Sequence, residues 1–307
     1  MRIVRREAAR SATAIAVGSF DGVHLGHQAM LARVREEAAR RSLVSAALTF
    51  EPLPREFFAG REAPPRLSSL AEKLALLAVH GVGEAFVERF DARFAAIPAP
   101  AFAERLARHY GARWVIVGPD FRYGARRQGD VEALRAAGRQ HRFDVEILQA
   151  VCVDGGRVSS TRVREALAAA RFDEAARLLG RPYSICGRVQ HGAKRGRAMG
   201  FPTANVRLAR PRAPLSGIFA VKCSTAATRG LEGVASLGSN PALGPHGPET
   251  LEAFLFDFSG DLYGEHLSIE FVKKLRNEAA FASLDELAAQ IARDCDAARA
   301  HFRATRT

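Results

Sequence analysis

Residues 14–27 have the sequence Ala14-Ile15-Ala16-Val17-Gly18-Ser19-Phe20-Asp21-Gly22-Val23-His24-Leu25-Gly26-His27. A short apolar run leads into a turn that contains Gly18 and Gly22, and a helical pattern begins near His27. This order of strand, glycine turn and helix directs backbone N–H groups and a helix N-terminus at a phosphate. The stretch therefore predicts a phosphate-binding turn, with His24 and His27 on either side of Gly26.

Other interpretations of the same stretch have less support. Neither G-x-G-x-x-G nor G-x-x-x-x-G-K-[ST] is present, so the usual dinucleotide and P-loop motifs are not indicated. A metal site is also disfavoured, because no third ligand lies near the two histidines at ligand spacing. Two histidines at a helix start are compatible with simple capping, and only the complete string favours phosphate binding.

The overall composition places limits on the class of protein. The chain has 307 residues, 48% hydrophobic and 25% charged, which is typical of a globular protein with two domains. The apolar run after the basic start is too short for a signal peptide, and no stretch is long enough to span a membrane. Four separated cysteines without a C-x-x-C motif predict reduced, buried thiols in a cytoplasmic protein: Cys152, Cys186, Cys223 and Cys295.

The net charge of +12 bears on the kind of partner. The basic excess is spread over both halves of the chain, with no basic tail and no long cationic run. A positive surface also attracts polyphosphate ligands. We therefore expect small anionic ligands, and neither nucleic acid nor a membrane, as partners.

The first half of the chain alternates strand-like and helix-like segments. After the opening turn and its helix, we expect strands at residues 43–50, 85–88, 114–117 and 145–151, and helices at 67–79, 101–110, 131–142 and 162–179. Repeated β-α units of this length predict a doubly wound parallel sheet. Ligands of such sheets bind beyond the carboxyl ends of the strands, where residues 18–27, 50–52 and 118–124 lie.

The pattern changes near Gly180-Arg181-Pro182. Short strand-like runs separated by glycine turns follow, at residues 185–190, 218–223, 234–237, 251–258 and 267–272. This spacing predicts a small antiparallel β-barrel, and an amphipathic pattern from Leu284 to Cys295 predicts a closing helix. The sequence thus divides into an α/β domain at residues 1–183 and a β-barrel domain at residues 184–307.

Two more segments of the first half carry groups suited to phosphate chemistry. Residues 118–124, Gly118-Pro119-Asp120-Phe121-Arg122-Tyr123-Gly124, follow a strand and combine a carboxylate, aromatics and an arginine. Residues 158–164 place Ser159, Ser160 and Thr161 at a helix start, with Arg164 one turn later. Hydroxyls at a helix N-terminus and an arginine together hold anions well. Taken alone, the segment is better interpreted as an ordinary N-cap, which is common for Ser and Thr.

The second half contains a glycine-rich basic segment at residues 187–205. It reads Gly187-Arg-Val-Gln-His-Gly192-Ala-Lys194-Arg-Gly196-Arg-Ala-Met-Gly200-Phe-Pro202-Thr203-Ala204-Asn205, which suits a flap over a triphosphate. Thr203 and Asn205 share one face of an extended segment and offer hard oxygens. A few such ligands together with phosphate oxygens is the usual way to hold Mg²⁺.

Glu252 is the candidate general base. In a regular strand over residues 251–258, Glu252 shares a face with Phe254, Phe256 and Phe258. A carboxylate beside aromatic rings is partly desolvated, which suits a base. Periodicity alone is equally compatible with an edge glutamate in solvent.

These motifs together resemble a known family. Residues 18–27, 118–124 and 159–164 are similar to the three motifs of the H-x-G-H nucleotidyltransferases, in the form found in prokaryotic bifunctional riboflavin kinase/FAD synthetase. The segment that ends in Pro202-Thr203-Ala204-Asn205 resembles the riboflavin kinase signature. The resemblance covers essentially the whole chain. It implies that ATP phosphorylates riboflavin to FMN, that a second ATP adenylylates FMN to FAD with release of pyrophosphate, and that Mg²⁺ serves both steps.

The resemblance also implies residue roles. In the first half, the residues that would contact ATP or flavin are Gly18, Phe20, His24, His27, Asp120, Ser160, Thr161 and Arg164, with His24, His27 and Arg164 catalytic. In the second half, they are Gly192, Lys194, Gly196, Thr203, Asn205, Glu252 and Arg276, with Glu252 as base and Thr203 and Asn205 on Mg²⁺. Asp120 would border the flavin or the adenine, and Arg276 lies in a segment that folds over the flavin.

Three positions depart from the family pattern. Leu53 stands where His is expected, and Asn240 and Ala242 replace an expected Arg and Thr. The first concerns a substrate contact of the adenylylating half, and the others lie near the kinase pocket. Two alternatives stay open: a chain with one working activity, and a regulator that binds flavin or RNA, which the charge of +12 would suit.

Overall fold

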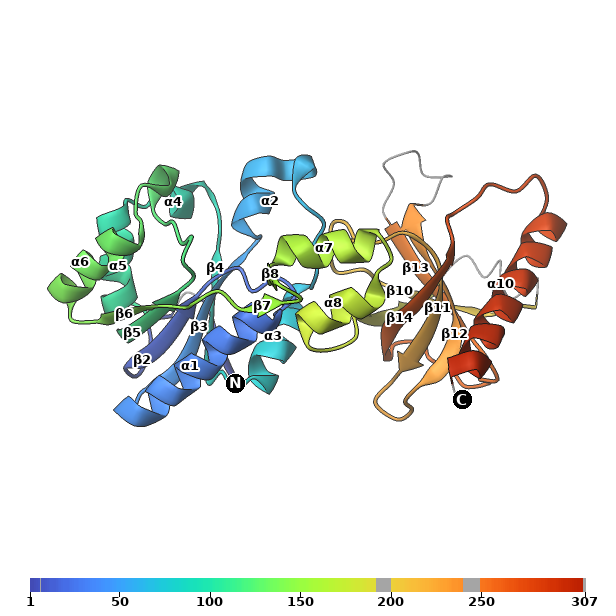
Figure 1. The fold of residues 1–307 in the computed structure, drawn as a ribbon, viewed down its shortest axis with the longest axis horizontal. Helices are drawn as coiled ribbons and strands as arrows, with labels where there is room; N and C mark the ends of the chain where they lie inside the picture. Colours follow the sequence, from blue (N-terminus) through green and yellow to red (C-terminus); the bar gives the residue numbers. More distant parts are fainter. Residues whose placement is uncertain (6, 192–199, 240–248, 306–307) are drawn as a thin grey trace. The chain divides into compact units, whose positions relative to one another are not determined.

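The computed structural model describes residues 1–5, 7–191, 200–239 and 249–305. Contacts divide the chain into two compact units (Figure 1). The first comprises Met1–Pro64 and Leu70–Ser160, and the second comprises Pro65–Ser69 and Thr161–Thr307. The two helices before Tyr183 thus group with the second unit.

The first unit is built on a six-stranded sheet with the order β1-β4-β3-β2-β5-β6. Every neighbouring pair is parallel. The strands are β1 (Arg2–Val4), β2 (Thr13–Val17), β3 (Val44–Glu51), β4 (Glu84–Arg89), β5 (Ala112–Val117) and β6 (Asp144–Ile147). The predicted doubly wound parallel sheet is confirmed.

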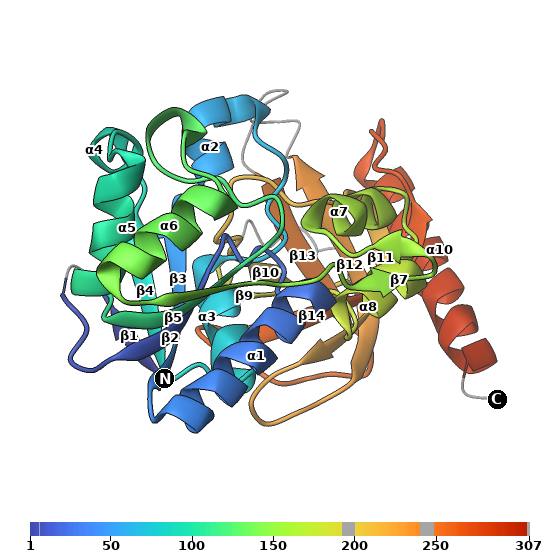
Figure 2. The same cartoon turned by 60° about the vertical axis from the view of Figure 1, so that its left-hand side comes forward.

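Every residue of the central strand β2 is buried. Successive side chains of a strand point to opposite faces of the sheet, so alternate residues of β2 pack into two separate cores. Ile15 and Val17 pack in one core, with side chains of α5 (Ala99–Arg108) and α6 (Val131–His141). Ala14 and Ala16 pack in the other, with side chains of α1 (Leu25–Arg41) and α3 (Leu70–Val79). Figure 2 shows α5 and α6 side by side over the sheet. Helices on both faces explain why β2 is a continuous apolar run.

Short elements complete the first unit. They are α2 (Pro54–Ala59), the 3₁₀ turns η1 (Gly60–Glu62) and η2 (Ala125–Arg127), α4 (Ala92–Ala95), and the hairpin β7 (Cys152–Val153) with β8 (Gly156–Arg157). The strand expected at 145–151 ends at Ile147.

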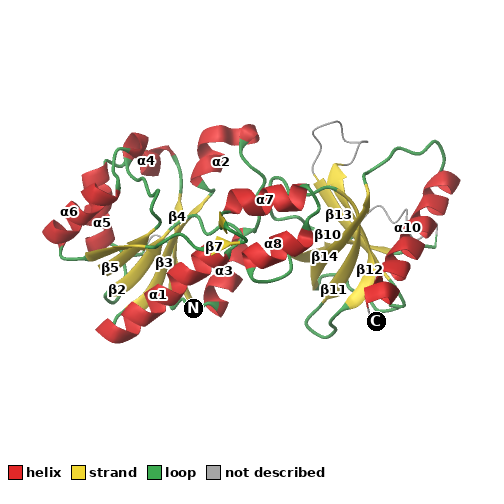
Figure 3. Ribbon diagram, in the orientation of Figure 1, coloured by secondary structure: helices red, strands yellow, loops and turns green. Residues whose placement is uncertain are grey.

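The second unit contains a closed antiparallel barrel with the order β10-β13-β12-β11-β14-β9. Its strands are β9 (Ser184–Gln190), β10 (Thr203–Val206), β11 (Gly217–Ser224), β12 (Leu231–Ser239), β13 (Glu249–Leu255) and β14 (His266–Arg276). Helix α10 (Leu284–Thr305) lies along the outer wall of the barrel, where Cys295, Ala298 and Phe302 are buried against Val234 and Phe256 (Figure 3). The predicted barrel and closing helix are confirmed.

Two expected elements differ from the structure. Residues 162–179 form two helices, α7 (Ser160–Ala168) and α8 (Phe172–Leu179), because Ala170 adopts a left-handed conformation with φ of 55° between them. The strand expected at 251–258 stops at Leu255, since Asp257 also has a positive φ, of 54°, and turns the chain.

The cysteines are only partly as expected. All four are free thiols, but Cys152 is exposed in the β7–β8 hairpin and Cys186 is half-buried. Cys223 and Cys295 are buried, and burial raises the pKa of Cys223 to about 12 and that of Cys295 to about 11. Among the described residues, no helix has the length and apolar character that a membrane span requires.

Candidate active sites

The first candidate site lies where the turn after β2 enters α1. His24 is the N-cap of α1, and its Nδ1 accepts a hydrogen bond from the backbone N–H of His27 at 3.4 Å. The two imidazole rings stack, with centroids 3.7 Å apart and planes 17° apart. A Cβ on Gly26 would lie only 3.2 Å from the His24 ring, which accounts for glycine between the histidines. The arrangement presents two imidazoles beside a helix N-terminus, where anions bind favourably.

His27 is held in its uncharged form. Its Nδ1 is buried and has no hydrogen-bond partner within the described part of the chain. Burial lowers the pKa of His27 well below 6.5, and the nearby positive charges of His24 and Lys73 lower it further. The fully buried Phe20 ring packs 5.2 Å from the His27 ring and against Gly18. Phe20 thus packs against both ends of the turn, at Gly18 and at His27.

The predicted hydroxyl segment is divided between the two units. The Ser160 hydroxyl donates to the backbone oxygen of Asp21 at 3.0 Å, which joins Ser160 to the phosphate-binding turn. Thr161 and Arg164 belong to the second unit, where the Arg164 Nε donates to the Pro65 carbonyl at 2.5 Å. The structure therefore brings Ser160 together with the turn that carries His24 and His27.

The loop after β5 holds Asp120 in an exposed ion pair with Arg157. Phe121 and Tyr123 stack beside it, with centroids 5.6 Å apart and planes 18° apart. Both rings follow the carboxyl end of a central strand, as predicted for residues 118–124.

An aromatic row that the sequence reasoning missed continues from this loop. Successive ring centroids lie 5.5 to 6.2 Å apart along Tyr123, Phe102, Phe94 and Phe90, which in turn contacts Phe57 and Phe58. Phe58 is 70% exposed, which is unusual for so large an apolar side chain. Two adjacent phenylalanines soon after the strand end at Glu51-Pro52 were the available signal.

The second candidate site lies on neighbouring strands of the barrel. Asn205 of β10 pairs directly with Glu252 of β13, and Thr203 pairs with Phe254. Residues opposite each other in an antiparallel ladder point to the same face, so Thr203, Asn205 and Glu252 share one. The Thr203 hydroxyl donates to the Glu252 carboxylate at 3.3 Å.

The aromatic surroundings expected for Glu252 are only partly correct. Phe254 shares its face, but Phe256 and Phe258 lie beyond the end of β13 and so no longer follow the strand alternation. Phe256 is buried in the core formed with α10, with the Arg299 guanidinium 4.1 Å from the ring centroid. Phe258 lines a pocket instead.

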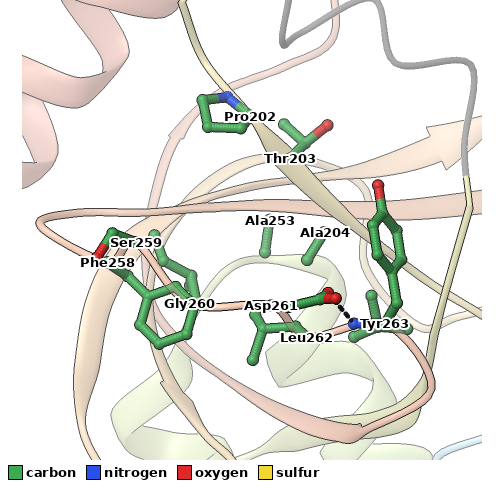
Figure 4. A pocket seen from close by; sticks show the side chains of 12 residues that line it. Pro202, Thr203, Ala204, Ala253, Phe258, Ser259, Gly260, Asp261, Leu262 and Tyr263 are labelled. Carbon is green, nitrogen blue, oxygen red and sulfur yellow. Dashed lines mark hydrogen bonds between the residues drawn. The ribbon is translucent and has the colours of Figure 1, made fainter.

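That pocket has a volume of about 430 Å³ and opens beside Thr203. Pro202, Thr203 and Ala204 of the β10 segment face the loop from Phe258 to Tyr263 across it (Figure 4). Within the loop, the Tyr263 N–H donates to the Asp261 carboxylate at 2.9 Å. The pocket is large enough for part of a nucleotide, and it adjoins the Thr203–Glu252 pair.

Arg276, at the end of β14, is held by α10. Its Nε and Nη2 donate to the Asp294 carboxylate at 2.8 to 3.1 Å, and Asp294 is buried. Five further positions singled out from the sequence lie outside the described residues: Gly192, Lys194, Gly196, Asn240 and Ala242. Leu53, the departure in the first half, is buried at the start of α2.

The donor sets bear on metal binding. Residues 1–5, 7–191, 200–239 and 249–305 contain no group of three or more His, Cys, Asp or Glu side chains suited to a metal. The hydroxyl oxygen of Thr203 and the amide oxygen of Asn205 are hard donors, of the kind that Mg²⁺ takes when phosphate oxygens complete its shell.

Two family models match consecutive parts of the chain. The FAD synthetase family matches residues 6–162, and the riboflavin kinase family matches residues 179–302. Curated relatives described as bifunctional riboflavin kinase/FMN adenylyltransferase match almost the full length. The protein of Escherichia coli K12 is 45% identical over 98% of this chain and 96% of its own, and that of Pseudomonas fluorescens is 47% identical over 92% and 91%.

A solved structure shares the fold over nearly the whole chain. It is a Streptococcus pneumoniae protein described as a macrolide-efflux protein, with a TM-score of 0.78 and 28% identity, and the match covers 96% of this chain and 97% of that one. This description belongs to the pneumococcal protein, and the two chains share the fold. On the two family models and the full-length relatives, the chain belongs to the bifunctional riboflavin kinase/FMN adenylyltransferase family.

Proposed function

We propose that this chain makes FAD from riboflavin in two steps at two separate sites. The barrel unit transfers the γ-phosphoryl group of ATP to riboflavin and gives FMN. The parallel-sheet unit transfers AMP from a second ATP to FMN and gives FAD and pyrophosphate. The observation that carries the proposal is the presence of one polar constellation in each unit, His24 with His27 and Thr203 with Asn205 and Glu252.

The adenylyl transfer needs no nucleophile from the protein. A phosphate oxygen of FMN attacks the α-phosphorus of ATP, the bond from this phosphorus to the bridging oxygen breaks, and pyrophosphate leaves. Catalysis then consists of positioning and of stabilising negative charge. We assign this to His24, His27 and the N-terminus of α1, with Ser160, Thr161 and Arg164 at the leaving phosphates and Gly18 giving the backbone close access.

The aromatic row supplies a surface for the flavin of FMN. The isoalloxazine ring is flat and largely apolar, and such rings stack on aromatic side chains. Phe58, Phe121 and Tyr123 lie beyond strand ends on the same sheet as the phosphate-binding turn, and Phe58 is left exposed. We assign the flavin to this row, with Asp120 at its border.

The phosphoryl transfer requires a base for the ribityl hydroxyl. Glu252 takes the proton from the ribityl hydroxyl. The ribityl oxygen then attacks the γ-phosphorus of ATP, the bond from this phosphorus to the bridging oxygen breaks, and ADP leaves. Thr203 positions the carboxylate through its hydrogen bond at 3.3 Å. We assign the nucleotide to the pocket between Thr203 and Tyr263. The family resemblance adds Gly192, Lys194 and Gly196 as ATP contacts and Arg276 as a flavin contact.

We also propose Mg²⁺ as the cofactor, held in the barrel unit by Thr203 and Asn205, where it would neutralise charge on the ATP phosphates. We further propose that the boundary between the two functional domains lies at Tyr183. The free thiols support a cytoplasmic location. The dispersed basic residues support small anions, and not nucleic acid, as partners.

The test is turnover. The purified chain is incubated with riboflavin, ATP and MgCl₂, and the flavins are separated by chromatography over time. FMN should rise first and FAD second, and FAD should also form from supplied FMN. A protein that binds flavins but converts none of them would refute the proposal and favour a flavin-binding regulator.

A further inference from the structure

Lys73 is a fully buried lysine on α3. No other lysine occurs in residues 1–193, where every other Lys or Arg position is arginine. Removing an ammonium group from water is costly unless its neighbours compensate for the lost hydration. An ammonium is also a compact point charge, unlike the wide guanidinium group of arginine. The use of lysine at this one buried position therefore indicates that its surroundings require a compact positive charge.

A hydrogen-bond relay connects Lys73 to the phosphate-binding turn. The Lys73 Nζ donates to the Thr49 hydroxyl at 3.2 Å, and this hydroxyl donates to the backbone oxygen of Ser19 at 3.2 Å. Thr49 is fully buried near the carboxyl end of β3, and Ser19 follows Gly18 in the turn. The relay thus fixes the backbone of the turn to α3.

The charge of Lys73 also affects the pKa of His27, at the end of the same turn. Burial lowers the pKa of His27, and the positive charges of His24 and Lys73 contribute in the same direction. The ammonium group thus acts on the imidazole through space as well as on the turn through Thr49.

We propose that Lys73 is a positioning residue of the adenylyl-transfer site: through Thr49 it fixes the turn that carries His24 and His27, and it adds a buried positive charge where the ATP phosphates bind. Preorganised charge of this kind stabilises the negative charge that develops on the phosphates. The inference rests on the proposed function of the first unit. The riboflavin kinase site lies in the other unit and does not involve Lys73.

The test compares Lys73→Met with the parent chain and with Lys222→Met, an exposed lysine of β11. The methionine keeps the length of the side chain and removes the charge. FAD formation from FMN should fall about 10²-fold in kcat, the loss typical of one preorganised donor, with the KM for FMN unchanged. FMN formation from riboflavin, measured on the same sample, should stay at the parent rate, and Lys222→Met should match the parent in both steps.

Two further readouts separate positioning from folding. Trp114, the chain's single tryptophan, is buried in the first unit, so its fluorescence reports the integrity of that unit. The pKa of His27, followed by histidine ring-proton NMR, should rise in Lys73→Met because a neighbouring positive charge is gone. If Trp114 shows that Lys73→Met does not fold, Thr49→Val provides the test, since it breaks the relay while leaving the charge in place. It should lower FAD formation about tenfold.

Parent-like FAD formation by a folded Lys73→Met, or by Thr49→Val where Lys73→Met does not fold, would overturn the inference. An unchanged pKa of His27 in a folded but inactive Lys73→Met would also contradict it. A parent chain that itself makes no FAD would refute the proposed function of the first unit, which is a different result.

Discussion

The imidazole rings of His24 and His27 stack 3.7 Å apart at the N-terminus of α1. Two rings this close do not both carry a positive charge readily, because like charges at such a distance disfavour ionisation. Burial of His27 acts in the same direction. The pair therefore offers hydrogen-bonding imidazoles to a phosphate while the helix N-terminus and Lys73 supply the positive field.

His27→Ala should abolish FAD formation from FMN and leave riboflavin phosphorylation intact. Loss of one preorganised donor typically costs ~10²–10³ in rate. Both rates are measured by chromatography of the flavins. His141→Ala, at the end of α6 in the same unit, is the control and should behave like the parent. Equal loss of both activities in a folded His27→Ala would argue against two separate sites.

The low pKa of His27 should make the first unit less stable in acid. In the unfolded chain the pKa returns to about 6.5, so the unfolded state binds more protons as the pH falls below that value. The stability associated with neutral His27 is therefore present above pH 6.5 and lost as the pH falls towards its lower folded value. Urea unfolding followed by Trp114 fluorescence measures this loss. The loss should be smaller in His27→Ala, and an identical pH dependence in both proteins would contradict the burial of a neutral imidazole.

Glu252→Gln should stop riboflavin phosphorylation, because the amide keeps the size of the side chain but cannot accept the proton. Removing a general base typically costs about 10²–10⁴ in rate, whereas the affinity for ATP should change little. FAD formation from supplied FMN should continue. Glu270→Gln, on strand β14 of the same barrel, is the control. Phosphorylation by Glu252→Gln at near the parent rate would show that another group is the base.

The β-barrel should fold without the parallel sheet, and its stability should depend on where the fragment begins. Fragments 184–307 and 161–307 should both phosphorylate riboflavin, and a fragment ending at Tyr183 should fold alone. The longer barrel fragment should unfold at the higher temperature, because it retains Phe172, whose ring lies 6.1 Å from Phe219, and the buried Tyr183. Burial of one large apolar side chain contributes about 1.5–3 kcal/mol. Equal melting temperatures would contradict this role, and an insoluble or inactive 184–307 would place the functional boundary before Tyr183.

The periodicity of the sequence was sufficient for the architecture. Residues 14–17 are apolar on both sides because β2 lies between two helical layers. The alternation of more and less buried residues in β9 and in the first part of β14 follows the inside and outside of a barrel. Local backbone geometry was less visible. Ala170 and Asp257 adopt positive φ values that glycine usually supplies, so the helix break and the early end of β13 had no sequence signal.

The sequence predicted site residues that belong to a contiguous motif. It did not predict those that only the packing of distant segments brings together. Gly26 between two histidines indicates a close approach of the backbone, and the structure places the His24 ring against it. The pairing of Asn205 with Glu252 was not predicted, because the register of β10 against β13 is set by the closed barrel. Lys73 and Thr49 come together only through the packing of α3 against the sheet, and nothing in their sequence surroundings marks them. The aromatic row is likewise assembled from four distant segments of the chain.

The most direct test of two independent sites on one chain is to mix the two inactivated proteins. His27→Ala should convert riboflavin to FMN and stop there, and Glu252→Gln should leave riboflavin unchanged. The mixture, supplied with riboflavin, ATP and MgCl₂, should form FAD, because FMN made by one protein is adenylylated by the other. If each variant alone retains its one predicted step but the mixture forms no FAD, or if either variant loses both steps while folded, the two-site account is contradicted.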